Sequence, residues 1–105
     1  MTNNELNEII HSLESQIIEL ESLITNGNFS KNEVISKFKN NTSSARATGI
    51  NVLFATVKEV AEKTNVIAEI EKAFPLEHKI TQLKIRFARC GQHLIEMISL
   101  MEEWG

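Results

Sequence analysis

Several residue types are missing or nearly missing from this sequence, and each absence excludes a kind of structure. There is no Asp, and there is one Cys and one Pro among 105 residues. A single cysteine cannot form an internal disulfide, which suits a reducing compartment, so we expect a cytoplasmic protein. No apolar run approaches the roughly 18 residues that a membrane-spanning helix requires, and we therefore expect no membrane partner.

The sequence also lacks a strong excess of charge of either sign. The formal net charge is −3, and 24% of the residues are charged. A domain that binds nucleic acid is usually basic, so this balance favours a protein partner. Hydrophobic residues make up 42% of the chain, which supports a folded core and argues against disorder. Residues 1–8 are polar and acidic, unlike a signal peptide.

The sequence has no recognisable arrangement of catalytic or metal-binding residues. There is no glycine-rich phosphate loop, and Cys90 and His93 are the only soft ligands that lie close together along the chain. A structural zinc site requires four ligands. A reactive thiol requires exposure, whereas Cys90 falls on an apolar stripe between Phe87 and Leu94. We therefore expect no catalytic residue, no metal, no cofactor and no enzymatic activity.

Apolar residues recur at helical spacing along the chain, and no segment alternates with period two, so the fold is predicted to be all-α. The first helix is expected over residues 4–25. Its apolar residues follow alternating steps of four and three, which is a heptad seam typical of a coiled coil. The seam consists of Leu6, Ile10, Leu13, Ile17, Leu20 and Ile24.

Two further helices are predicted before the proline. A short one covers residues 30–40, since Ser30 and Glu33 form a capping-box pattern. A long one begins at residue 44 or 48 and ends near residue 74. Gly49 either interrupts its start or belongs to its cap. Thr64 and Glu71 occupy seam positions of this helix, where polar residues lower stability and can fix register.

The fourth helix is expected to start at Pro75, because proline suits the first position of a helix. Its seam runs through Leu76, Ile80, Leu83, Phe87, Cys90, Leu94, Met97, Met101 and Trp104. The two long helices on either side of Pro75 should form an antiparallel hairpin. We thus predict one helical domain over residues 1–105, a bundle of three long helices plus one short helix.

The first helix is shorter than the expected fourth helix, so we expect apolar surface to remain uncovered near the C-terminus. Methionine-containing surfaces adapt to varied partners. The chain is therefore expected to form a homodimer or an obligate complex with another helical protein. The residues predicted to form the partner interface are Ile10, Ile17, Leu20, Ile24, Met97, Ile98, Met101 and Trp104.

Small residues in the fourth helix suggest a second place of close contact. Ala88, Cys90 and Gly91 would admit another helix, or a bulky side chain such as Phe54. Alternatively, Gly91 is exposed and merely weakens the helix by about 1 kcal/mol relative to alanine.

The leading functional hypothesis is a non-enzymatic helical interaction module, such as an adaptor, chaperone, inhibitor or assembly factor that acts through an apolar heptad surface. The abundance of Asn, Ile, Lys and Glu hints at a bacterial or phage accessory protein. An enzyme or ligand carrier with a site inside the bundle is a further alternative.

A small DNA-binding transcriptional regulator is the second hypothesis. Residues 56–66 resemble the opening of helix-turn-helix repressors, which would place a recognition helix before residue 72. That segment carries two carboxylates and lacks residues that read base edges, so one continuous amphipathic helix is favoured there. The residues that could contact nucleic acid or an acidic partner are Lys31, Lys37, Lys39 and Arg46.

Overall fold

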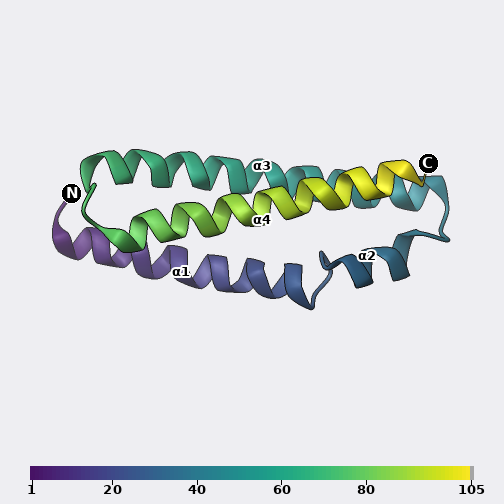
Figure 1. Ribbon diagram of the computed structural model, residues 1–105, viewed down its shortest axis with the longest axis horizontal. Helices are drawn as coiled ribbons and strands as arrows, with labels where there is room; N and C mark the ends of the chain where they lie inside the picture. Colours follow the sequence, from purple (N-terminus) through teal and green to yellow (C-terminus); the bar gives the residue numbers. More distant parts are fainter. Residues whose placement is uncertain (105) are drawn as a thin grey trace.

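The computed structural model describes residues 1–104, which form four helices and no strand. They are α1 (Asn3–Thr25), α2 (Lys31–Phe38), α3 (Ser43–Ala73) and α4 (His78–Glu103). The described chain measures 51 × 21 × 16 Å, and α3 and α4 lie antiparallel along its whole length (Figure 1). The predictions of an all-α fold and of an antiparallel hairpin are confirmed.

The hairpin is covered on one side by two helices placed end to end. α1 lies along the N-terminal part of α4, and α2 continues the same line toward the C-terminal end of α4 (Figure 1). The backbone of α1 packs on α4 and hardly approaches α3. The expectation of uncovered apolar surface near the C-terminus is wrong over the part of α4 that α1 is too short to reach, because α2 packs there.

Each of the first three helices begins at a hydroxyl side chain that accepts a hydrogen bond from the backbone. The acceptors are Thr2 for α1, Ser30 for α2 and Thr42 for α3. Such caps satisfy one of the free N–H groups of the first turn. Only half of the predicted capping box forms, because the backbone N–H of Ser30 donates to the carbonyl of Gly27 instead of to Glu33.

The turn between α3 and α4 differs from the prediction. Pro75 precedes the helix, which starts at His78 with Glu77 as its N-cap, and Leu76 is 89% exposed instead of lying on the seam. The Glu77 carboxylate accepts a hydrogen bond from the Lys79 N–H at 3.3 Å. A start at Pro75 would have made Phe74 the cap, and phenylalanine has no acceptor for this role.

Gly49 lies inside α3, which is unbroken from Ser43 to Ala73. A Cβ at this position would lie 2.8 Å from Cζ of Phe38 and 2.9 Å from Cε of Met101. Its backbone torsions are helical, without positive φ. Gly49 is therefore neither an interruption nor a cap. It lets α2 and the end of α4 approach α3 closely.

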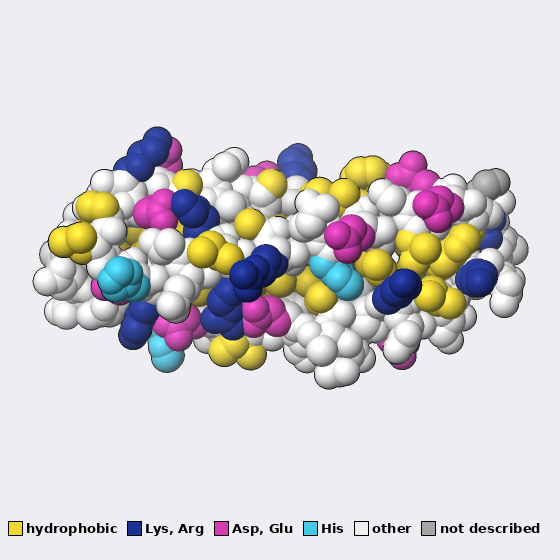
Figure 2. Space-filling model, viewed as in Figure 1, with side chains coloured by type: hydrophobic (Ala, Val, Ile, Leu, Met, Phe, Trp, Pro, Cys, Tyr) yellow, Lys and Arg dark blue, Asp and Glu magenta, His cyan; other side chains and the backbone are white. Residues whose placement is uncertain are grey.

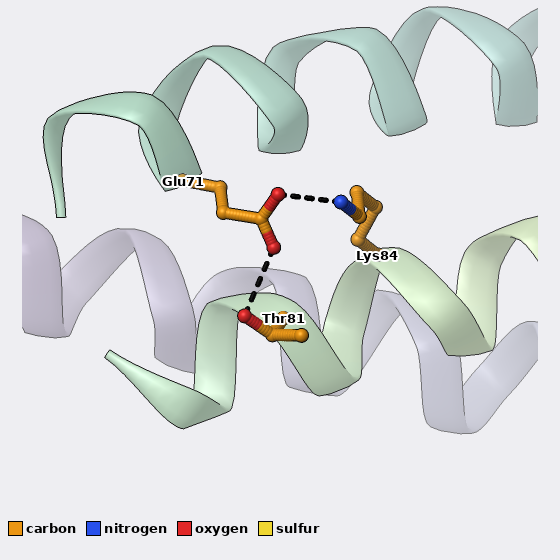
Figure 3. A network of polar contacts seen from close by, with 3 residues as sticks. All are labelled: Glu71, Thr81 and Lys84. Atoms are coloured by element: carbon orange, nitrogen blue, oxygen red, sulfur yellow. Dashed lines mark hydrogen bonds and ion pairs between the residues drawn. The ribbon is translucent and has the colours of Figure 1, made fainter. Parts of the chain in front are cut away.

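A network of polar contacts joins the two helices of the hairpin near their connecting turn (Figure 3). The carboxylate of Glu71 accepts a 2.9 Å hydrogen bond from the Thr81 hydroxyl and a second one from the Lys84 ammonium. These hydrogen bonds lower the pKa of Glu71. By contrast, the Thr64 hydroxyl donates to the Val60 carbonyl of its own helix. Of the two polar seam residues, only Glu71 therefore ties α3 to α4.

The charges of α4 are segregated in a way that matches the two helices lying beside it. α1 contains five glutamates and no lysine or arginine, and the basic half of α4, residues 78–91, contains no acid. The acidic half, residues 92–103, lies beside α2 with its two lysines and one glutamate. Opposite charges thus favour the observed direction of α1 and α2 along α4.

One ion pair makes this charge match explicit. Arg86 donates to Glu21 through Nε at 3.0 Å and through Nη2. The two parallel bonds lower the pKa of Glu21 and raise that of Arg86. Bidentate arginine–carboxylate contacts add geometric specificity, and this pair fixes where α1 sits along α4.

Candidate interaction surface

The residues predicted to meet a partner lie instead in the core of the chain itself. Ile10, Ile17, Met97, Ile98 and Met101 are buried, and Leu20, Ile24 and Trp104 are partly buried against them. The exposure on which that interface prediction depended is therefore absent. The reason is physical: the heptad seams of α1 and α4 face each other within one chain, and α2 covers the remaining end.

Some apolar side chains of α2 and of the C-terminal part of α4 still reach the surface. Ile35, Leu100 and Trp104 are half-buried, and Figure 2 shows its largest hydrophobic area over α2 and the C-terminal part of α4. Leu100 and Trp104 pack on the core below them.

The four predicted basic contacts lie on α2 and around the start of α3. Lys31, Lys37 and Lys39 are exposed, and Arg46 is half-buried. Two of the four are engaged locally: Arg46 donates to the Asn41 carbonyl at 2.7 Å, and the Lys37 ammonium lies 5.4 Å from the centre of the Phe38 ring. The acidic half of α4 lies at the same end of the chain.

The helix-turn-helix geometry does not form. Residues 56–72 all belong to the single helix α3, without a turn between a first and a recognition helix. The interpretation of this segment as one continuous amphipathic helix is confirmed. The DNA-binding hypothesis therefore loses the motif that suggested it.

Cys90 and His93, the two potential metal ligands that lie close together in the sequence, both have structural roles in the fold. Cys90 is buried, and burial raises the pKa of its thiol, which disfavours the reactive thiolate. His93 contacts the Phe29 carbonyl through Nε2 at 3.0 Å and so ties α4 to the loop between α1 and α2. Within residues 1–104, no three residues among His, Cys, Asp and Glu are grouped so that they could hold a metal ion.

Two grooves flank α3 on the side of α1 and α2. The larger, about 490 Å³, lies between α2 and α3, and the smaller, about 350 Å³, lies between α1 and α3. Ligand sites require a few convergent polar groups. In the larger groove, Asn41 already donates to the Lys37 carbonyl and accepts from the Thr42 N–H. Both polar atoms of the Asn41 side chain are thus hydrogen-bonded to the local backbone.

The opposite side of the hairpin, away from α1 and α2, has a different character. We call it the hairpin face, and it consists of Ile50, Phe54, Val57 and Ala61 on α3 together with Ala88, Gly91 and Ile95 on α4. Phe54 is 53% exposed and Ile95 is 45% exposed. Between the two helices lies a depression of about 260 Å³, and none of the residues that line it carries a charge.

Small residues form part of the lining of this depression, beside the polar side chains of Thr64, Asn65 and Gln92. Ala61, Ala88 and Gly91 line it, and a Cβ added at Gly91 would lie 3.3 Å from Cγ1 of Val60. The sequence had indicated a close approach at this point, by another helix or by Phe54. Because Phe54 is half exposed, it does not fill the depression of its own chain. Cys90, the third small residue of that prediction, is buried in the core.

The sequence indicated the α4 part of the hairpin face through Ala88 and Gly91, but it did not identify the α3 part, although a signal was present. Phe54, Ala61 and Ala68 follow one another at seven-residue intervals on α3, as do Ala88 and Ile95 on α4. Seven residues are nearly two helical turns, so each set lies on one face. These sets are short and contain alanines, so they are weaker signals than the isoleucine and leucine seams.

Comparisons with known proteins do not identify this chain. No protein-family model, no curated protein and no solved structure gives a match. Within the described part of the chain, no helix combines the length and the apolar character that crossing a membrane would require.

Proposed function

We propose that this chain is a non-enzymatic helical interaction module that binds another protein through the hairpin face. The observation that carries the proposal is an uncharged depression between two long helices. Ile95 lines it and is 45% exposed, and Phe54, three residues before Val57 of the lining, is 53% exposed. Single exposed apolar residues are ordinary on protein surfaces, whereas contiguous apolar surface marks interaction sites. Val57 and Ile95 line the same depression, so the apolar residues of the two helices are contiguous here.

The size and chemistry of the depression fit a protein better than a small molecule. Its volume of about 260 Å³ is below the roughly 300–1,000 Å³ of typical ligand pockets. Small residues such as Ala88 and Gly91 allow another helix to approach closely. A helix that lies over α3 and α4 would complete a four-helix arrangement, which is a common way to bury such a hairpin.

A position-specific photo-cross-linking experiment tests this function. A photoreactive phenylalanine analogue replaces Phe54 in one version and Ile18 in the other, which is 59% exposed on α1, and both are irradiated in cells of the source organism. We expect discrete protein adducts from position 54 and few from position 18. Equal or absent labelling at the two positions would contradict the proposed function.

A further inference from the structure

We propose that α2 is a lid, which opens while α1, α3 and α4 stay folded and leaves a seat on the hairpin that accepts an amphipathic helix in its place. This seat lies under α2, whereas the hairpin face lies on the other side of α3 and α4, so each site can exist without the other. The property that singles out α2 is the kind of contact that holds it.

No polar side chain joins α2 to the hairpin in the described chain. The Glu71 network joins α3 to α4, and a bidentate ion pair joins α1 to α4. The polar contacts of residues 31–38, by contrast, all stay within residues 30–41. The nearest long-range tether is the contact of His93 with the Phe29 carbonyl, which lies before the helix. An element held by apolar contacts alone can leave without stranding a buried hydrogen-bonding partner.

The packing of α2 is also limited in extent. Of its eight residues, Val34 is buried and Phe38 is half-buried. The groove of about 490 Å³ lies between α2 and α3, so the two helices do not close on each other along this side. Residues 39–42, which follow α2, form hydrogen bonds only within residues 35–46 of the described chain. Elements with few buried apolar contacts are the ones that open locally, before the whole chain unfolds.

The seat beneath α2 is apolar, and α2 shows what it accepts. Cζ of Phe38 and Cε of Met101 meet over Gly49, at 2.8 Å and 2.9 Å from the position of an added Cβ. Val34 lines the same groove as Leu53, which is buried. The seat therefore fits a helix with an aliphatic and an aromatic residue one turn apart. The lysines of α2 and the acidic half of α4 add that such a helix should be basic.

Two proline variants separate an open lid from a closed one. Ser36 is exposed inside α2, so Ser36→Pro breaks the helix and keeps every apolar residue of the lid and the seat. Lys31→Pro is the matched control, because Lys31 is the first residue of α2, where proline is tolerated. Ser30 before it is already extended, with φ −71° and ψ 152°, as a residue before proline must be.

Alkylation of single cysteines measures opening in the full chain. Met101→Cys combined with Cys90→Ser reports on the seat, since Met101 is buried there. A second series keeps Cys90, whose thiol is buried near Glu21 of α1, and reports on the rest of the core. We expect the thiol at position 101 to react about tenfold faster or more with Ser36→Pro than with Lys31→Pro, and Cys90 to react equally slowly with both.

The other outcomes overturn the lid. Equal rates at position 101 would mean that breaking α2 does not uncover the seat. Faster reaction at both thiols would mean that the core cannot stay folded without α2. In the unmodified chain, amide hydrogen exchange measures the same opening: the amides of residues 34–38 should be about tenfold less protected or more than those of residues 49–53, and equal protection would also overturn the lid.

A synthetic peptide with residues 28–41 of this chain tests whether the seat accepts a helix from outside. At saturating concentration it should slow alkylation at position 101 of the Ser36→Pro chain by about threefold or more, because the occupied seat excludes the reagent. The same peptide with Phe38→Asp is the control and should have no effect. An equal result with the two peptides, whether protection or none, overturns the seat as a helix-binding site.

Discussion

Replacing Gly49 by alanine tests how α2 is held against the hairpin. The added Cβ would lie 2.8 Å from Cζ of Phe38 and 2.9 Å from Cε of Met101, whereas carbon atoms in favourable contact lie about 3.5–4.0 Å apart. The methionine tip can rotate away. The phenylalanine ring is rigid, and moving it by nearly 1 Å requires α2 to shift or the ring to leave its preferred rotamer.

Two opposing effects set the magnitude of this change. Overpacking in a core costs about 1–3 kcal/mol, and alanine in place of glycine inside a helix contributes about 1 kcal/mol. We therefore expect a net loss of about 1 kcal/mol in the free energy of unfolding. Urea denaturation at a fixed protein concentration measures it, since self-association would otherwise shift the result.

The matched control is Gly91→Ala, which should raise the free energy of unfolding where Gly49→Ala lowers it. Its Cβ would meet only Cγ1 of Val60, at 3.3 Å, and the position is half-buried, so the helical preference of alanine should prevail and stabilise the chain by up to about 1 kcal/mol. A Gly49→Ala chain as stable as the wild type would refute the packing argument. Combining it with Phe38→Leu should recover part of the loss, because the shorter side chain removes the clash.

Three further predictions concern caps, pH and the thiol. Thr42→Ala should lower the free energy of unfolding by about 1 kcal/mol in urea, because the Ala45 N–H loses its acceptor. The pKa values of Glu21 and Glu71 lie below the ordinary 4.5, so their contribution to stability is present above pH 4.5 and is lost as pH falls through the folded-state values. Unfolding at pH 5 and pH 3 should therefore show a smaller loss for the Glu21→Gln, Glu71→Gln double variant than for the wild type. Cys90 should resist alkylation in the folded chain and react rapidly in urea, and equal rates would contradict its burial.

Local signals in the sequence predicted the helices well. Three-and-four spacing of apolar residues marks all four, and Ser30 marks the start of α2. The start of α3 was expected at residue 44 or 48, whereas the helix begins at Ser43 with Thr42 as its N-cap. The start of α4 was misplaced because two local signals competed. Proline at the first position is a preference, whereas the Glu77 carboxylate supplies an actual hydrogen bond to the Lys79 N–H.

The arrangement of the helices was harder to predict than their existence. An apolar stripe shows that a helix face is buried, but it does not identify the element that buries it. The residues around Met97 and Met101 were therefore assigned to a partner, although the eight-residue α2 covers them. Such a short helix is marginal on its own and depends on tertiary packing. Gly49 was the available signal, since a buried glycine inside a helix permits a close neighbour.

The structure leaves one side of the α3–α4 hairpin without a covering helix. Two packed helices present two sides, and α1 and α2 in line cover only one side of α3 and α4. A helix face that remains in water ordinarily carries charge. Here α3 places Lys58 and Glu62 beside the depression and leaves its lining uncharged, with Phe54 protruding. That is the pattern of a face that another protein covers, as the proposed interaction through the hairpin face requires.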